Sequence, residues 1–181
     1  MKKIILDLAV SLDGFIEEKN GETDWCIMDE EMDFGSFLSE IDTIFYGRVS
    51  YDLWGNYEPE ASTSEIDLQM WSAIHAKKKY VFSSQVRTDT QATFLATDIV
   101  EEVTRIKEQN GKDIWLYGGA KLIKTFVKHE LIDIYRISIH PIVLGEGTPL
   151  FENLSGRINL KLLDVNKYKS GVVQLIYEQK R

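Results

Sequence analysis

Two consecutive glycines between an apolar run and a helical pattern form the first feature of this sequence with chemical content. Gly118 and Gly119 follow the apolar residues 114–117 and precede apolar residues at helical spacing between 122 and 127. Two side chains are missing where a helix would present its first unpaired N–H groups, so the backbone could approach a phosphate closely. The pair fits a diphosphate, although a plain tight turn uses the same dipeptide.

Sequence motifs of the common phosphate-binding and hydrolytic enzymes are missing from the chain. Neither a Gly-x-Gly-x-x-Gly fingerprint nor a Gly-x-x-x-x-Gly-Lys loop occurs, which argues against a standard Rossmann domain and a P-loop enzyme. No Gly-x-Ser-x-Gly motif accompanies His75, His129 and His140, so the inventory for nucleophilic hydrolysis is also incomplete.

We expect no metal site. Residues 129–133 read His-Glu-Leu-Ile-Asp and lack the second histidine of a zinc-binding His-Glu-x-x-His motif. The acidic residues between Asp29 and Asp33 could suggest a divalent cation, but acidic residues in the first turn of a helix are favoured by the helix dipole alone.

Trp25 differs from the other three tryptophans because it follows a polar stretch, residues 21–24. A large ring in a polar loop can cover a planar substrate, whereas the remaining tryptophans are expected to pack in the core. Packing is also the alternative for Trp25.

Strand and helix patterns alternate along most of the chain, which is typical of an α/β fold. We expect one domain over residues 1–181, with a mainly parallel sheet and an antiparallel C-terminal hairpin. Helices are expected after an acidic first turn at 29–33, after the capping box Ser62-x-x-Glu65, and after Asp98. Strands are expected at 4–10, 43–46, 80–82, 114–117 and 134–143, and the hairpin at 158–168 and 172–178.

The formal net charge of -8 disfavours binding to nucleic acid or to an anionic membrane surface. The single Cys26 cannot form an internal disulfide, and the N-terminus has neither a signal-peptide pattern nor a membrane-spanning run, so we expect a cytoplasmic protein.

The order of the motifs along the chain resembles the dihydrofolate reductase-like family. It is most similar to the branch that contains the reductase domain of the bifunctional riboflavin-biosynthesis deaminase-reductase. The resemblance covers nearly the whole chain and implies a three-layer α/β/α fold. The motifs that carry it are Ser11-Leu12-Asp13-Gly14, Tyr46-Gly47-Arg48, Ser83-Ser84, Tyr117-Gly118-Gly119 and Gly145-Glu146-Gly147-Thr148-Pro149-Leu150-Phe151.

In that family NADPH lies across the ends of the central strands, and the resemblance implies the same here. Arg48 and Lys121 are the cations expected to bind the additional phosphate of NADPH. Asp13 and Trp25 are the substrate-binding candidates. The cofactor-binding candidates are Ala9, Gly14, Gly47, Arg48, Val49, Ser50, Ser83, Ser84, Gly118, Gly119, Ala120, Lys121 and Leu122.

Dihydrofolate reductases carry an acidic residue in the helix after the first loop, and ungapped spacing back from Gly47-Arg48 ends on Glu31. Glu31 is therefore the catalytic candidate, with Glu30 and Asp33 as neighbours. The alternative is a solvated carboxylate at a helix start.

The resemblance implies an NADPH-dependent oxidoreductase that transfers a hydride to a small heterocyclic or aminopyrimidine-ribose substrate, similar to 5-amino-6-(5-phosphoribosylamino)uracil reductase. The zinc motif of the deaminase half is missing, so a free-standing reductase is expected, and a homodimer is implied as well. Alternatives are a dihydrofolate or pterin reductase, and a dimer that binds nucleotides without catalysis or is purely structural.

Overall fold

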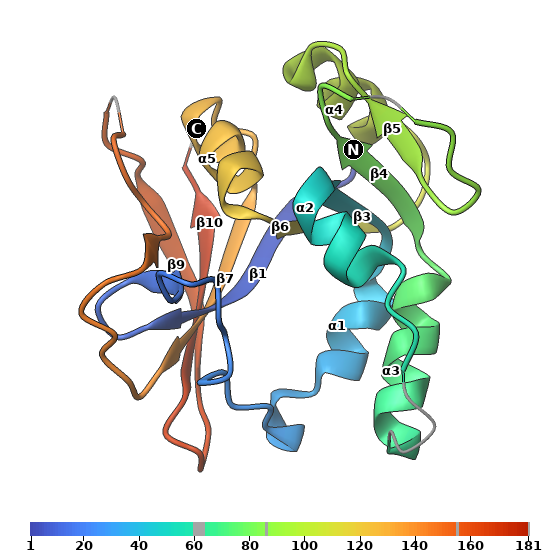
Figure 1. Cartoon of the computed structure of the whole chain (residues 1–181). Helices are drawn as coiled ribbons and strands as arrows, with labels where there is room; N and C mark the ends of the chain where they lie inside the picture. The colour runs from blue at the N-terminus through green and yellow to red at the C-terminus, as the bar shows by residue number, and fades with distance from the viewer. Residues whose placement is uncertain (60–63, 86, 155, 181) are drawn as a thin grey trace. The chain divides into compact units, whose positions relative to one another are not determined.

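The computed structural model describes residues 1–59, 64–85, 87–154 and 156–180 (Figure 1). The chain forms two compact units, the first made of residues 1–2 and 33–119 and the second of residues 3–32 and 120–181. Strands and helices alternate along the sequence as expected for an α/β protein. In the described residues, no helix is both long enough and apolar enough to cross a membrane.

The sheet of the first unit is parallel throughout, in the order β5-β4-β3-β6. Its central strand β3 has five of its seven residues buried, because it is covered on both faces. The short strand β5 was not predicted, since three residues give too little periodicity. The strands are β3 (Ile41–Gly47), β4 (Lys78–Phe82), β5 (Thr93–Leu95) and β6 (Asp113–Gly118).

The helices of the first unit include α1 (Phe34–Glu40), which Figure 1 shows beside α3 (Glu65–His75). Phe34 and Phe37 of α1 pack edge-on against Trp115 of β6, with ring centroids 5.4 and 5.6 Å away. The unit also contains α2 (Arg48–Ser50), which continues into the π-helical turn η2 (Tyr51–Gly55), and α4 (Ile99–Lys107).

The prediction that acidic residues form the first turn of α1 is wrong. Asp33, with φ 44°, is the N-cap, and its carboxylate accepts a hydrogen bond from the Ser36 N–H, so the helix begins only at Phe34. The other acidic residues precede it, in and before the 3-10 turn η1 (Glu30–Met32). By contrast, Asp98 caps α4 as predicted. Ser62 of the predicted capping box lies outside the described residues.

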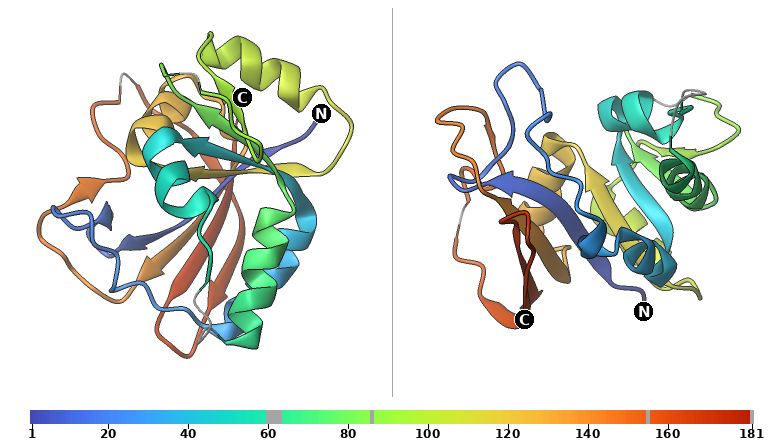
Figure 2. Two further views of the ribbon diagram at one scale, coloured as in Figure 1. Left: turned by 45° about the vertical axis from the view of Figure 1, so that its right-hand side comes forward. Right: turned by 90° about the horizontal axis from the view of Figure 1, so that it is seen from below.

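The second unit has the strand order β1-β7-β10-β9. β1 pairs with β7 in parallel, and β10 pairs antiparallel with both β7 and β9, which confirms the mainly parallel arrangement with an antiparallel C-terminal hairpin (Figure 2). A two-stranded ribbon of β2 and β8 was not predicted. The strands are β1 (Ile4–Ser11), β2 (Phe15–Glu17), β7 (Ile134–His140), β8 (Thr148–Pro149), β9 (Leu160–Lys167) and β10 (Val173–Gln179).

The two faces of the strands β1, β7 and β10 differ in polarity. Because side chains alternate along a strand, Leu6 and Val10 of β1 lie on one face, and both are buried. The opposite face, which we call the polar face, carries Asp7, Ala9 and Ser11 of β1, Arg136, Ser138 and His140 of β7, and Gln174 of β10. The helix α5 (Ala120–Lys128) adds four buried apolar side chains to this unit.

Candidate functional site

The glycine pair lies where β6 ends in the first unit. Gly118 is the last residue of β6, has φ 119°, and is joined to Gly119 by a cis peptide bond. The register places Tyr46 beside Gly118 and Gly47 beside Phe82. Gly47, Ser83 and Gly118 therefore lie together at the carboxyl edge of these strands, the arrangement that the family resemblance implies.

A side chain at Gly119 would displace the hydroxyl group of Ser50. A Cβ built on it would lie 2.8 Å from the Ser50 Oγ, a distance that real Cβ atoms essentially never show. The hydroxyl of α2 thus approaches the glycine backbone directly, and both present polar groups at the same edge. Val49, between Arg48 and Ser50, is 60% exposed.

Arg48 belongs to a charged cluster in the first unit. Its Nη1 lies 2.9 Å from Asp52 Oδ2, and Arg87 Nη2 lies 2.7 Å from the other oxygen of the same carboxylate. Asp89 is 3.7 Å from Arg87 and accepts hydrogen bonds from the Gln91 N–H at 2.8 Å and the Tyr51 hydroxyl at 2.9 Å. Burial acts to raise the pKa of Asp89, but these two hydrogen bonds, the one from Gln91 first, lower it.

Arg87 is the cofactor-site candidate that the sequence analysis missed. Its guanidinium lies 4.7 Å from the Phe94 ring centroid and 5.7 Å from that of Tyr51, positions suited to cation–π attraction. With Asp52 between them, Arg48 and Arg87 place two guanidiniums around one carboxylate. No pattern marks Arg87 in the sequence, because it lies in a loop beyond β4.

The serine pair after β4 forms a local turn. The Ser83 hydroxyl accepts a hydrogen bond from the Gln85 N–H at 3.0 Å and donates one to the Gln85 carbonyl. Ser84 is exposed.

The cofactor candidates of the second unit lie in β1, in the turn after it and in the first turn of α5. Ala9 lies opposite Ser138, and Gly14 adopts φ 89° in the turn after β1. Of the three α5 candidates, Ala120 is half-buried, Lys121 is exposed and Leu122 is buried.

The carboxylate of Asp13 binds the protein's own loop. It accepts hydrogen bonds from the Ser11 hydroxyl at 2.6 Å and from the N–H groups of Leu144 and Gly145 at 3.2 and 2.8 Å. These bonds, the one from Ser11 first, lower the pKa of Asp13. The contacts indicate a residue that fastens the loop at 144–145 to the end of β1, and none of them supports substrate binding.

Trp25 packs edge-on against His140 of the polar face, with ring centroids 5.5 Å apart. The His140 Nδ1 lies 3.2 Å from the Ile27 N–H and accepts its hydrogen bond, and burial lowers the pKa of the ring, so His140 is neutral with its proton on Nε2. The buried indole N–H of Trp25 has no hydrogen-bond acceptor among the described residues. A ring on this face with an unused donor is compatible with the expected substrate contact.

An acidic and a basic side chain lie side by side on the polar face. Asp7 Oδ2 is 3.4 Å from Arg136 Nε, and the two side chains are only 9% and 15% exposed. Burial raises the pKa of Asp7 to about 7, and the opposing effect of Arg136 is smaller. On the same face the Gln174 side-chain amide donates to the Ser138 hydroxyl at 3.2 Å.

Glu31 does not lie in a helix facing a sheet. It is part of η1, its side chain is 46% exposed, and its carboxylate forms an ion pair with Lys169. The expected helical position is therefore wrong, because Asp33 starts the helix two residues later. A solvated ion pair of this kind gives no support to Glu31 as a proton donor.

The polar face could have been predicted from the sequence. Asp7 interrupts an otherwise apolar strand, and Arg136, Ser138 and His140 recur with the period of two that places them on one face of a strand.

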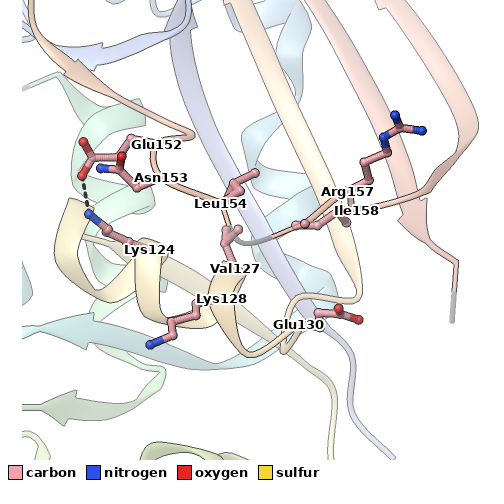
Figure 3. Close-up of a pocket in the computed structure, with 10 residues that line it drawn as sticks. Lys124, Val127, Lys128, Glu130, Glu152, Asn153, Leu154, Arg157 and Ile158 are labelled. Atoms are coloured by element: carbon pink, nitrogen blue, oxygen red, sulfur yellow. Dashed lines mark hydrogen bonds and ion pairs between the residues drawn. The ribbon is translucent and has the colours of Figure 1, made fainter.

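A pocket in the second unit lies between α5 and residues 152–154 and 156–158 (Figure 3). Lys124 and Glu152 form an ion pair at 2.6 Å on its rim, and Val127 and Leu154 contribute apolar surface. None of the sequence-predicted site residues lines it. Across the described ranges, no group of three or more acidic, histidine or cysteine side chains could hold a metal ion.

Comparison with known proteins assigns the family. The RibD C-terminal domain matches residues 2–174 of this chain. YyaP, an uncharacterized protein of Bacillus subtilis (strain 168), is 56% identical over 177 residues, which cover 97% of this chain and 94% of YyaP.

Two solved structures show the same fold at low sequence identity. A putative riboflavin biosynthesis protein from Shewanella sp. PV-4 superposes with a TM-score of 0.78 and 23% identity, covering 100% of both chains. Dihydrofolate reductase from Enterococcus faecalis, solved with NADP(H), superposes with a TM-score of 0.68 and 12% identity, covering 99% of this chain and 97% of that one. The chain thus has the α/β fold of dihydrofolate reductase and belongs to the RibD C-terminal domain family, a family of NADPH-dependent reductases.

Proposed function

We propose that this protein is an NADPH-dependent reductase that transfers a hydride to a small heterocyclic or aminopyrimidine-ribose substrate. The observation that carries the proposal is the group of residues at the carboxyl edge of the first unit's sheet. There the Ser50 hydroxyl lies against Gly119, and two arginines share one carboxylate.

The residues at this edge fit the phosphates of NADPH. Gly118 and Gly119 have no side chains that would keep a phosphate away from their backbone. The Ser50 hydroxyl lies beside Gly119 and adds a polar group. Arg48 and Arg87 would exchange their ion pairs with the Asp52 carboxylate for contacts with the 2′-phosphate, since guanidinium and phosphate form strong bidentate hydrogen bonds. When bound, NADPH supplies the hydride, and the protein supplies alignment and a proton.

The polar face of the second unit suits a planar substrate with several hydrogen-bonding groups. Trp25 has a buried N–H donor without an acceptor in the described part of the chain, and Asp7 and Arg136 offer a carboxyl group and a guanidinium on the same face. A heterocycle such as an aminopyrimidine has both donors and acceptors at its edge, which these groups could pair.

The test is NADPH oxidation by the purified protein with aminopyrimidine, pterin, nitro and quinone acceptors. We expect turnover with an aminopyrimidine-type acceptor, dependent on NADPH and reduced in the Arg48→Ala/Arg87→Ala variant. Turnover with a pterin alone would favour a dihydrofolate-type reductase instead. Saturable NADPH binding without oxidation for any acceptor would refute the proposed reaction.

One observation favours the second candidate function, a dimer that binds nucleotides without catalysis. The acidic residue expected to donate the proton, Glu31, lies in an exposed ion pair. Such a dimer would still bind the nucleotide at the carboxyl edge of the first unit but would reduce no substrate. The screen of acceptors therefore distinguishes it from a reductase.

A further inference from the structure

We propose that Asp7, and not Glu31, carries the proton that the reduced substrate receives, and that Arg136 holds the Asp7 carboxylate in place. This inference rests on the proposed function and adds the proton-carrying group to it.

The position of Asp7 follows from the alternation of side chains along β1. Asp7 and Ala9 are two residues apart in a strand, so they lie on the same face with a separation of about 6.6 Å. The resemblance to the dihydrofolate reductase-like family implies that Ala9, one of the cofactor-binding candidates, borders the nicotinamide. A planar substrate that lies against the nicotinamide on this face would therefore extend over Asp7.

The surroundings of Asp7 keep its carboxyl group near the midpoint of its titration at neutral pH. Arg136 is its register partner on β7, at 3.4 Å. Tyr168, which follows β9, interacts electrostatically with Asp7 and Arg136 and also with Asp29 and Asp164. The imidazole of His140 lies on the same face. Burial raises the pKa of Asp7 to about 7, the range in which a carboxyl group can both release and recover a proton.

A purely structural role explains this pair poorly. A buried ion pair is weak evidence for stability, because desolvation of the two charges offsets their attraction.

The proposed proton transfer balances. As the carbon of a substrate C=N or C=O bond gains the hydride, the nitrogen or oxygen takes the proton from Asp7 Oδ, giving CH–NH or CH–OH. Asp7 is left as a carboxylate beside the Arg136 cation, which favours the charged form, and water returns the proton afterwards. No other co-reactant is needed.

The experiment compares Asp7→Asn with the matched control Glu31→Gln. We expect Asp7→Asn to lower the reduction rate at least about 100-fold, the usual contribution of a general acid, while NADPH affinity stays within about twofold. Glu31→Gln should keep the rate. Asp7→Glu should restore part of the activity with a shifted pH profile, and it serves also if the Asn variant fails to fold. A wild-type rate or an unchanged pH profile in Asp7→Asn would overturn the proposal.

A second readout does not depend on turnover. In carbon-13 NMR spectra of the protein with labelled aspartate, the resonance lost in Asp7→Asn should titrate near neutral pH. Titration in the ordinary acidic range would refute the inference while leaving the proposed function intact. If the wild-type protein reduces no acceptor, the proposed function fails and the proton-carrying role fails with it, even when Asp7 titrates near neutrality.

Discussion

Cofactor choice is the property that the arginine cluster of the first unit should control. We expect Arg48→Ala and Arg87→Ala each to weaken NADPH binding, because each would remove charge-assisted hydrogen bonds to the 2′-phosphate. Such bonds contribute roughly 1.5 to 3 kcal/mol. Both guanidiniums are nearly half exposed, at 44% and 45%, so water and salt screen them and about 1 kcal/mol for each is the appropriate value. The double variant should then lose about 2 kcal/mol, roughly 30-fold in Kd.

Removal of the Asp52 charge should have the opposite effect on NADPH affinity. Its carboxylate holds both arginines and competes with a bound phosphate for them. Asp52→Asn should therefore tighten NADPH binding while it leaves NADH binding unchanged.

The assay is calorimetric titration of each variant with NADPH and with NADH at one fixed salt concentration, accompanied by a thermal melt. Arg105→Ala is the matched control, because Arg105 is an exposed arginine paired with Glu102 on α4. Lys121→Ala tests the cation predicted from sequence. If the double variant keeps the wild-type ratio of NADPH to NADH affinity, the two arginines do not bind the 2′-phosphate. If only Lys121→Ala lowers that ratio, Arg87 has no role in cofactor choice.

Further expected results concern the glycine pair, two buried ionisable groups and assembly. Gly119→Val should leave the protein folded in a thermal melt but abolish NADPH binding by calorimetry, because the new side chain meets the Ser50 Oγ; unchanged binding would make the turn purely structural. The contribution of Asp7 to the free energy of unfolding should fall as pH rises from about 4 to about 7. The reason is that Asp7, whose pKa is raised from 3.8 to about 7 in the folded protein, keeps a proton that the unfolded chain has lost. Urea titrations over this pH range should show the fall in the wild-type protein and not in Asp7→Asn. Lys79→Met should raise the melting temperature, because Lys79 is 2% exposed and burial lowers its pKa; a lower melting temperature would show that its contact with His75 matters more. Light scattering should give twice the mass of 20.9 kDa for the proposed homodimer, and the monomer mass at all concentrations would contradict it.

Elements with a strong apolar period could be predicted from the sequence. β1, β6, α5 and the C-terminal hairpin lie where the patterns placed them, and the mainly parallel sheet pattern with antiparallel C-terminal strands is confirmed. The edge that gathers Gly47, Ser83 and Gly118 was also predictable, because carboxyl ends of parallel strands meet at the same edge.

The remaining features depend on contacts that periodicity does not encode. The spacing to Glu31 assumed a helix that Asp33 in fact starts later, so the carboxylate lies in an exposed pair with Lys169. Arg87 joins Arg48 only through Asp52, a relation between a loop and a helical turn. Asp7 and Arg136 become partners through the register of β1 against β7, 129 residues apart in the chain.

Calorimetric titration of the unmodified protein with NADPH and NADH tests the central claim most directly. The proposed function predicts saturable binding of one NADPH per chain and weaker binding of NADH. Absence of saturable NADPH binding, or equal affinity for the two nucleotides, would contradict it.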